Sequence, residues 1–146
     1  MNKAVEILLV EDNASDAEMT LDALKMNGFH YKIFHVRDGA LALDFLFAEG
    51  EHNGRDISDT PNVILLDLKM PKVSGIEVLQ KIRSDERTKM IPVVVLTSSA
   101  EDPDIKKCYE LGVNSYVVKP VEFELFQKEI AGLGLYWMTV NRQPMK

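Results

Sequence analysis

The sequence predicts an α/β fold in which a doubly wound parallel sheet carries helices on both faces. Short continuous runs of β-branched and aliphatic residues indicate strands that are buried on both sides. Each run is followed by a segment with helical spacing, so that strand and helix alternate five times along the 146 residues. This alternation is typical of right-handed crossovers within one parallel sheet.

Two strand–helix pairs are expected in the first third of the chain. They comprise a strand at about 5–10, a helix at about 14–27, a strand at 31–36 and a helix capped by Asp38. The first helix is expected to stop at Gly28, because glycine suits a helix end. The second strand carries Lys32 and His35 and is therefore predicted to lie at a sheet edge. The polar stretch 50–61 has no apolar period and is predicted to be a loop.

Three further pairs fill the remainder. The strands are expected at 63–66, from 93 and at 116–118. The first of the three helices is expected after the turn 70–75, the second from about Asp102 to Gly112 and the third from about 122 to 140. The last helix carries a stripe that is expected to face the core: Phe123, Phe126, Ile130, Leu133, Trp137 and Val140. Leu135, Tyr136 and Met138 add apolar surface beside it, which either folds back onto the domain or meets a partner.

Composition narrows the classes of function. A net charge of −6, from 17 basic and 23 acidic residues, opposes nonspecific binding to nucleic acid. No apolar stretch approaches ~18 residues, so no membrane span is expected, and no signal-peptide layout is present at the start. A single cysteine, Cys108, suits a reducing cytoplasm and is expected in the core. We expect one domain over 1–146, with its core at about 5–130 and the last helix reaching about 140.

Residues with useful chemistry follow the strands where a parallel sheet forms its site. Glu11 and Asp12 follow the first strand, Asp67 follows the third, Thr97 ends the fourth, and Lys119 follows the fifth. Ligands of open α/β sheets bind outside the carboxyl ends of the strands. These side chains are therefore expected to converge on one patch.

This set of residues predicts phosphoryl chemistry. Glu11, Asp12 and Asp67 would repel one another unless a cation neutralises them, and Mg²⁺ prefers such oxygen ligands. Asp67 is the best candidate nucleophile, because a carboxylate can form an acyl phosphate. Lys119 would offer positive charge and Thr97 a hydroxyl to phosphoryl oxygens. Each residue alone also fits a cap, a turn or plain surface, so the prediction depends on their joint placement.

Other nucleotide and metal motifs are absent. The chain has neither a G-x-x-x-x-G-K-[ST] loop nor a G-x-G-x-x-G turn after its first strand. Its histidines, His30, His35 and His52, lack the spacing of metal ligands and are expected at the surface or a sheet edge.

Four segments carry a family resemblance: Ile7–Asn13, Leu66–Pro71 with Gly75, Val95–Ser98 and Gly112–Pro120. With them the chain resembles the receiver domain of two-component response regulators over essentially its whole length. The resemblance implies a flavodoxin-like (βα)5 sheet in the order 2-1-3-4-5. It also implies a phosphoacceptor rather than an enzyme, one that assists its own phosphorylation and dephosphorylation. The loop 50–61 and Leu135-Tyr136-Trp137 further resemble the small regulators that partner phytochrome-type histidine kinases.

The resemblance also implies roles for single residues. Asp67 would accept the phosphoryl group from a sensor histidine kinase, with Mg²⁺ held by Asp12, Asp67 and the backbone carbonyl of Lys69, and with Glu11 acting through water. Lys119 and Thr97 would bind phosphoryl oxygens. Tyr116 would turn inward as Thr97 moves, the alternative being an aromatic side chain that stays in place. The Lys119–Pro120 bond would be cis.

Output is expected to pass through protein contacts. A homodimer through the fourth helix, the fifth strand, the fifth helix and the C-terminal tail is one such contact, as the family often uses. Lys69 and Ser99, two positions beyond Asp67 and Thr97, are expected to flank the path of water to the phosphoryl group and to tune its lifetime.

Two rival functions stay open at the level of sequence. One is a Mg²⁺-dependent phosphatase with an aspartate nucleophile, a class that needs a second aspartate where this chain has Lys69. The other is an interaction module that works without phosphorylation, which usually has lost an acid or the lysine.

Overall fold

Five parallel strands form one sheet in the order β2-β1-β3-β4-β5 in the computed structural model of the chain, which describes residues 3–28 and 30–144. The strands are β1 (Ile7–Val10), β2 (Ile33–Val36), β3 (Val63–Leu66), β4 (Val93–Thr97) and β5 (Ser115–Val118). The α-helices are α1 (Ala14–Leu24), α2 (Gly39–Leu46), α3 (Gly75–Ser84), α4 (Asp102–Glu110) and α5 (Phe123–Leu135). The predicted fold class and strand order are confirmed.

The central strands are β1, β3 and β4, and every residue in them is buried. This burial explains their continuous apolar sequence, because side chains on both faces meet covering helices. β2 lies at one edge, as predicted from His35 and from Lys32 just before the strand, and is only half-buried over most of its length. β5 forms the other edge.

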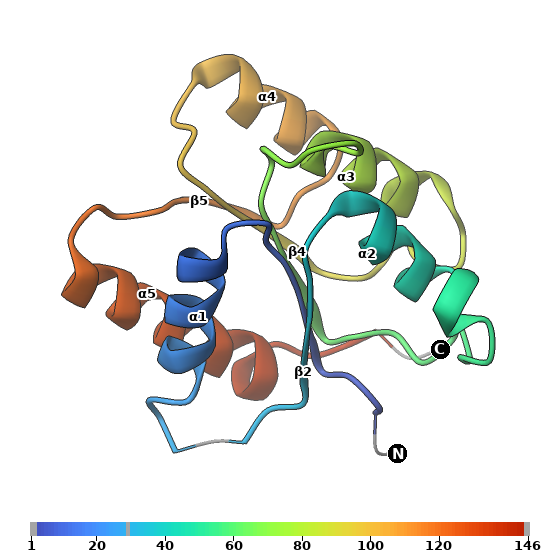
Figure 1. Cartoon of the computed structure of the whole chain (residues 1–146), viewed down its shortest axis with the longest axis horizontal. Coiled ribbons are helices and arrows are strands. Elements are labelled where there is room, and N and C mark those ends of the chain that lie inside the picture. Colours follow the sequence, from blue (N-terminus) through green and yellow to red (C-terminus); the bar gives the residue numbers. More distant parts are fainter. Residues whose placement is uncertain (1–2, 29, 145–146) are drawn as a thin grey trace.

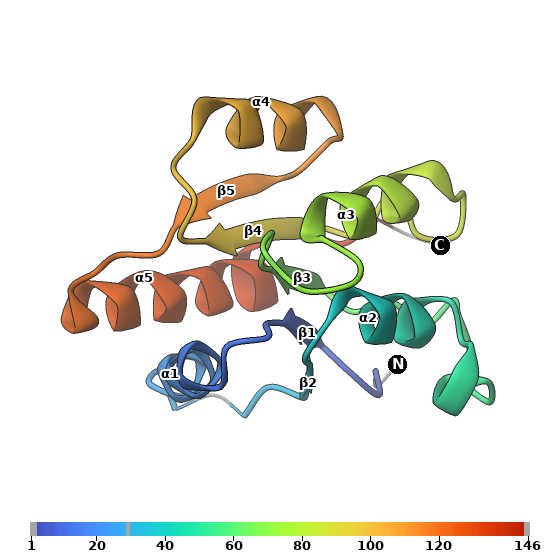
Figure 2. The same ribbon diagram turned by 45° about the horizontal axis from the view of Figure 1, so that its top comes forward.

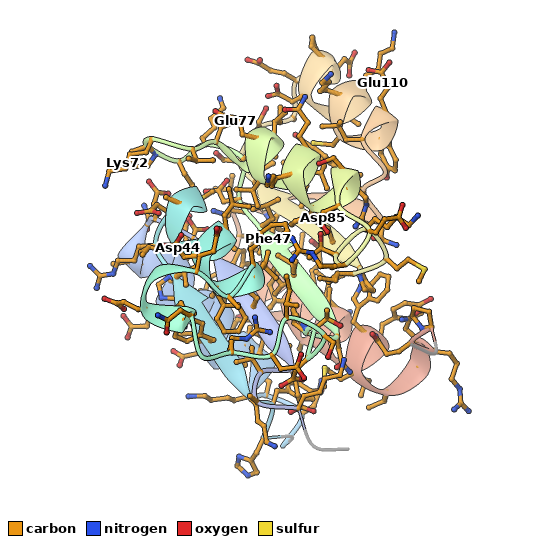
Figure 3. All side chains as sticks on the ribbon, turned by 90° about the vertical axis from the view of Figure 1, so that its right-hand side faces the viewer. Asp44, Phe47, Lys72, Glu77, Asp85 and Glu110 are labelled. Atoms are coloured by element: carbon orange, nitrogen blue, oxygen red, sulfur yellow. The ribbon has the colours of Figure 1, made fainter. Side chains whose placement is uncertain are left out.

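Helices cover the two faces of the sheet unequally. α2, α3 and α4 lie on one face, and α1 and α5 pack side by side on the other (Figures 1 and 2). Each face has its own apolar core, with Leu8, Ile64 and Val95 on the first and Leu9, Leu65 and Val94 on the second. The outer surfaces of α3 and α4 carry Glu77 and Glu110, which point away from the sheet (Figure 3).

Local sequence signals set the helix starts. The side chains of Asn13 and Asp38 accept hydrogen bonds from the first turns of α1 and α2. Ser74 and Glu77 form a capping box at α3. The N-cap of that helix is therefore Ser74, and Asp67 does not cap it. Pro103 stands in the first turn of α4, as predicted.

The stripe expected along the last helix is only partly correct. Phe126, Ile130 and Trp137 are buried, whereas Phe123 and Val140 are 52% and 60% exposed. A π-helical turn, η2 (Tyr136–Val140), continues α5. Phe123 and Val140 are the first and last residues of this combined helical segment. The predicted loop 50–61 contains one short 3₁₀ turn, η1 (Gly50–His52). Arg55 anchors this loop by donating to the carbonyl oxygens of Phe45 and Asp59.

Candidate functional site

The carboxyl ends of β1, β3, β4 and β5 bring the predicted site residues together. Asp67 donates its backbone N–H to Val10, which places it beside the Glu11–Asp12 pair. Lys119 likewise donates its backbone N–H to the carbonyl oxygen of Thr97, at 2.7 Å. The parallel ladder therefore continues just past the strands and fixes where each side chain leaves the backbone.

Three carboxylates form a tight cluster at this edge. Glu11, Asp12 and Asp67 each offer an oxygen, and these oxygens all lie within 4.8 Å of one another. Glu11 and Asp67 are buried, whereas Asp12 is exposed. Burial, with the charge of Asp67, raises the pKa of Glu11 to about 7, although the hydrogen bond with Lys119 acts to lower this pKa. The cluster is therefore electrostatically unfavourable without a counterion.

The donor set fits a hard divalent cation. It consists of oxygen atoms, and the exposed Asp12 leaves one side open to the water that such an ion retains. Among the described residues, none donates a hydrogen bond to the carbonyl oxygen of Lys69, so that atom is free to act as a ligand. The side chain of Lys69 is exposed, and its backbone N–H faces Asp67 Oδ1 at 3.5 Å.

Lys119 faces the acids from the end of β5. Its Nζ lies 2.6 Å from Glu11 Oε1, 2.9 Å from Asp16 Oδ2 and 3.6 Å from Asp67 Oδ2. Burial alone would lower the pKa of Lys119, but its hydrogen bonds with Glu11 and Asp16 and the charge of Asp67 raise it. The ammonium group is thus held in its charged form beside the candidate nucleophile.

Asp16 is a member of this site that the sequence analysis missed. It stands in the first turn of α1, where an acid is ordinarily explained by the positive end of the helix dipole. The available signal was its position in the first helical turn after Asp12, close to the carboxyl end of β1. His35 was also missed as a support: its Nε2 donates to the carbonyl oxygen of Glu11 at 2.7 Å.

Thr97 and Tyr116 meet at Ser99. The buried hydroxyl of Thr97 accepts the backbone N–H of Ser99 at 3.4 Å, and Tyr116 Oη donates to the carbonyl oxygen of Ser99 at 2.8 Å. The Ser99 hydroxyl is buried and donates to Asp104 Oδ2 in the first turn of α4, at 2.6 Å. The Ser99 side chain thus points toward α4, and its effect on the phosphoryl lifetime stays a prediction.

One expectation taken from the family resemblance fails. The Lys119–Pro120 peptide bond is trans, as are all other peptide bonds among the described residues. The trans isomer is the lower in energy for most X–Pro bonds, so nothing in the residues themselves required cis.

Comparison with known proteins gives the family. A family model described as the response regulator receiver domain matches residues 7–131. The chain belongs to the response regulator receiver family. Members of this family accept phosphoryl groups from histidine kinases in signalling and are generally not enzymes. No comparison favours a phosphatase or a phosphorylation-independent module.

Curated relatives cover most of the chain. It is 44% identical over 138 residues to the probable methanogenesis regulatory protein FilR2 of Methanothrix harundinacea, covering 94% of this chain and 86% of the relative. It is 39% identical over 138 residues to the response regulator Rcp1 of Synechocystis, covering 94% and 92%.

Solved structures extend the likeness to metal-bound and phosphorylated proteins. The Mn²⁺-bound form of Rcp1 superposes with a TM-score of 0.89 at 37% identity, covering 99% of this chain and 100% of that one. The phosphorylated cyanobacterial phytochrome response regulator RcpA gives 0.90 at 36% identity, with the same coverage. The bacteriophytochrome response regulator RtBRR gives 0.77 at 53% identity, covering 99% and 85%.

Within residues 3–28 and 30–144, no helix is both long and apolar enough to cross a bilayer.

Proposed function

We propose that Asp67 is the phosphoacceptor of this receiver domain. One observation carries the proposal: the buried carboxylate of Asp67 belongs to a cluster of three acids and has an ammonium group 3.6 Å from its Oδ2. A carboxylate oxygen of Asp67 would attack the phosphorus of a phosphohistidine. The new O–P bond forms as the N–P bond breaks, and the electron pair of that bond stays on the imidazole nitrogen.

Mg²⁺ is the cation that we propose for the cluster. Asp12, Asp67 and the backbone carbonyl of Lys69 would hold it, with Glu11 acting through water. Bound there, the ion would neutralise charge on the transferred phosphoryl group. The Mn²⁺ form of the relative Rcp1 supports a divalent cation in this family. In this way the domain would assist its own phosphorylation and its later hydrolysis, without being an enzyme for another substrate.

Lys119 and Thr97 would bind the phosphoryl oxygens. Lys119 already directs its ammonium group at the cluster, and Thr97 stands at the end of the neighbouring strand. If Thr97 turned toward a phosphoryl group, its hydroxyl would leave Ser99, the residue that also accepts the hydrogen bond of Tyr116. We infer that Thr97 and Tyr116 change position together on phosphorylation, because both form hydrogen bonds with the backbone of Ser99.

The phosphodonor that we propose is a phytochrome-type sensor histidine kinase. The structural relatives RcpA and RtBRR are a phytochrome and a bacteriophytochrome response regulator. The comparison with each of them covers 99% of this chain, which includes the segment after α5. The exchange would take place in the cytoplasm, which the single unpaired cysteine also suits.

Output through a homodimer is the second part of the proposal. We treat 1–146 as one receiver domain whose α4, β5, α5 and tail form the contact face. Apolar side chains are exposed on these elements: Tyr109, Val118, Phe123, Leu125, Leu135, Tyr136 and Val140. Sedimentation of the protein with and without beryllofluoride tests the dimer, and a monomer in both states at high concentration would exclude it.

Intact-mass measurement tests the phosphoacceptor. Incubation with Mg²⁺ and acetyl phosphate or phosphoramidate should add one phosphoryl group to the wild type and none to Asp67→Asn. Asp59→Asn is a control, since Asp59 lies in the loop before β3, away from the cluster. Turnover of small phosphate esters without a mass gain would instead indicate a phosphatase.

A further inference from the structure

Asp16 reaches Lys119 across the domain, from the first turn of α1 to the end of β5. The two residues are 103 positions apart, and Asp16 Oδ2 accepts a hydrogen bond from Lys119 Nζ at 2.9 Å. The Lys119 side chain is only 10% exposed and that of Asp16 is 29% exposed. The pair therefore forms at the border between the buried cluster and solvent.

Helix capping does not explain this contact. The cap of α1 is Asn13, whose Oδ1 accepts the backbone N–H of Asp16 at 2.9 Å. An acid in the first helical turn would interact favourably with the helix dipole while its carboxylate pointed into water. Here the Asp16 carboxylate instead points toward the Lys119 ammonium group. Both side chains line a pocket of about 250 Å³, which Ser98 and Pro120 line as well.

The donors of Lys119 show what the contact does. An ammonium group has three N–H donors. Glu11 takes one at 2.6 Å and Asp16 takes another at 2.9 Å, whereas Asp67 Oδ2 lies at 3.6 Å, beyond a good hydrogen bond. Two fixed acceptors leave a third donor on the side of Asp67. A phosphoryl oxygen on Asp67 could accept that donor without breaking either existing bond.

We propose that Asp16 is a positioning residue for phosphotransfer: with Glu11 it holds Lys119 so that the free N–H donor faces the phosphoryl group arriving at Asp67. The inference rests on the proposed role of Asp67. It assigns to Asp16 no contact with the phosphoryl group and no proton transfer. The positioning role requires a hydrogen-bond acceptor for Lys119 Nζ at position 16, and the negative charge of Asp16 matters less.

Phosphorylation rates of four variants test the proposal. The protein is treated with acetyl phosphate at saturating Mg²⁺, and the mass gain is followed in time. Asp16→Ala, which removes the acceptor, should lower the rate constant roughly tenfold, because a flexible lysine chain loses its orientation. Asp16→Asn keeps an acceptor oxygen and should stay within about threefold of the wild type.

Matched controls come from the same helix. Asp22 is an exposed aspartate of α1 whose side chain has no hydrogen bond or ion pair with any residue that the structure describes. Asp22→Ala and Asp22→Asn remove the same charge and should leave the rate unchanged. Thermal melting shows whether each variant is folded. If Asp16→Ala is not, then Asp16→Ser, whose shorter side chain keeps the first turn polar, takes its place with the same expected loss.

The outcomes separate the two proposals. Equal rates for Asp16→Ala and the wild type would overturn the positioning role and leave the phosphoacceptor intact. Equal losses for Asp16→Ala and Asp16→Asn would also overturn it, because charge alone would then explain the effect. A wild type that gains no phosphoryl group would overturn the role of Asp67, and the inference with it.

Discussion

Lys119 Nζ lies 2.6 Å from Glu11 Oε1, which joins two residues 108 positions apart in the chain. Their side chains are 10% and 2% exposed, so both charges are largely removed from water. A buried ion pair gains little over apolar packing, but each partner becomes costly when the other is lost. Lys119 is therefore important for stability as well as for chemistry.

Lys119→Met should lower the free energy of unfolding by about 3 kcal/mol, because it leaves the Glu11 carboxylate buried without its cation. Urea unfolding at pH 8 in a metal chelator measures the change. Lys106→Met is a suitable control, since Lys106 is exposed on α4 and forms no ion pair within residues 3–28 and 30–144. The same loss in both variants would show that the buried pair has no special role.

Asp12→Asn should have opposite effects with and without metal. In a chelator it removes one of three carboxylates whose oxygens lie within 4.8 Å, and it should raise the free energy of unfolding by about 1 kcal/mol. With Mg²⁺ the wild type should be stabilised by ligand binding, and the variant should lose this gain. Melting temperatures with and without Mg²⁺ measure both effects. A wild type that melts at one temperature in both conditions would argue against the metal site.

The main features of the site could be predicted because strand order and strand ends determine them. Once the apolar runs were assigned to parallel strands, the residue after each run had to lie at one edge, as Asp67 and Lys119 do. The contacts of Asp16 and Ser99 could not be predicted, because they depend on which way a side chain turns from a loop or first helical turn. Periodicity also misplaced Phe123, since a helix end extends beyond the sheet that it covers.

Ser99→Ala should destabilise the protein by about 2 kcal/mol, because it removes a hydrogen bond to the carboxylate of Asp104. The neighbouring Ser98 is exposed, so Ser98→Ala should change the free energy of unfolding by less than about 0.5 kcal/mol. A double-mutant cycle with Asp104→Ala isolates the interaction. Additive effects of the two substitutions would mean that Ser99 and Asp104 are not coupled.

Cys108 should be unreactive in the native protein. It is fully buried, and desolvation, with a smaller effect of Asp104, raises the pKa of its thiol to about 11 from an ordinary value of 9.0. Iodoacetamide at pH 8 should label it only after unfolding in urea, because the reactive thiolate is scarce and shielded. Rapid labelling of the native protein, followed by mass, would contradict this.

The same shift predicts a dependence of stability on alkaline pH. The folded state holds the Cys108 proton more tightly than the unfolded state does. The contribution of this thiol to the free energy of unfolding is therefore complete below about pH 9 and is lost as the pH rises toward about 11. The free energy of unfolding should therefore fall more steeply over this window in the wild type than in Cys108→Ala. If the two curves ran parallel, the thiol would have the same pKa in the folded and unfolded states, which would contradict the raised pKa of Cys108.

Gly75 lies where the start of α3 meets the backbone of the candidate phosphoacceptor. A Cβ at this position would overlap the carbonyl oxygen of Asp67 and lie 2.6 Å from the Cα of Leu68. Both neighbours are backbone atoms of the two residues that follow β3, so they cannot turn aside as a flexible side chain would. Gly75→Ala should therefore lower the free energy of unfolding by about 2–3 kcal/mol.

Gly75→Ala should also slow phosphorylation by acetyl phosphate, since relief of the overlap displaces Asp67 from the acids and from Lys119. Gly132→Ala is the matched control, because Gly132 lies in α5 and its added Cβ would have no described atom within 4 Å beyond the adjacent backbone of its own helix. It should gain about 0.5–1 kcal/mol from alanine's helix preference and keep the wild-type rate. If Gly75→Ala were phosphorylated as fast as Gly132→Ala, the close approach of α3 would have no part in placing Asp67.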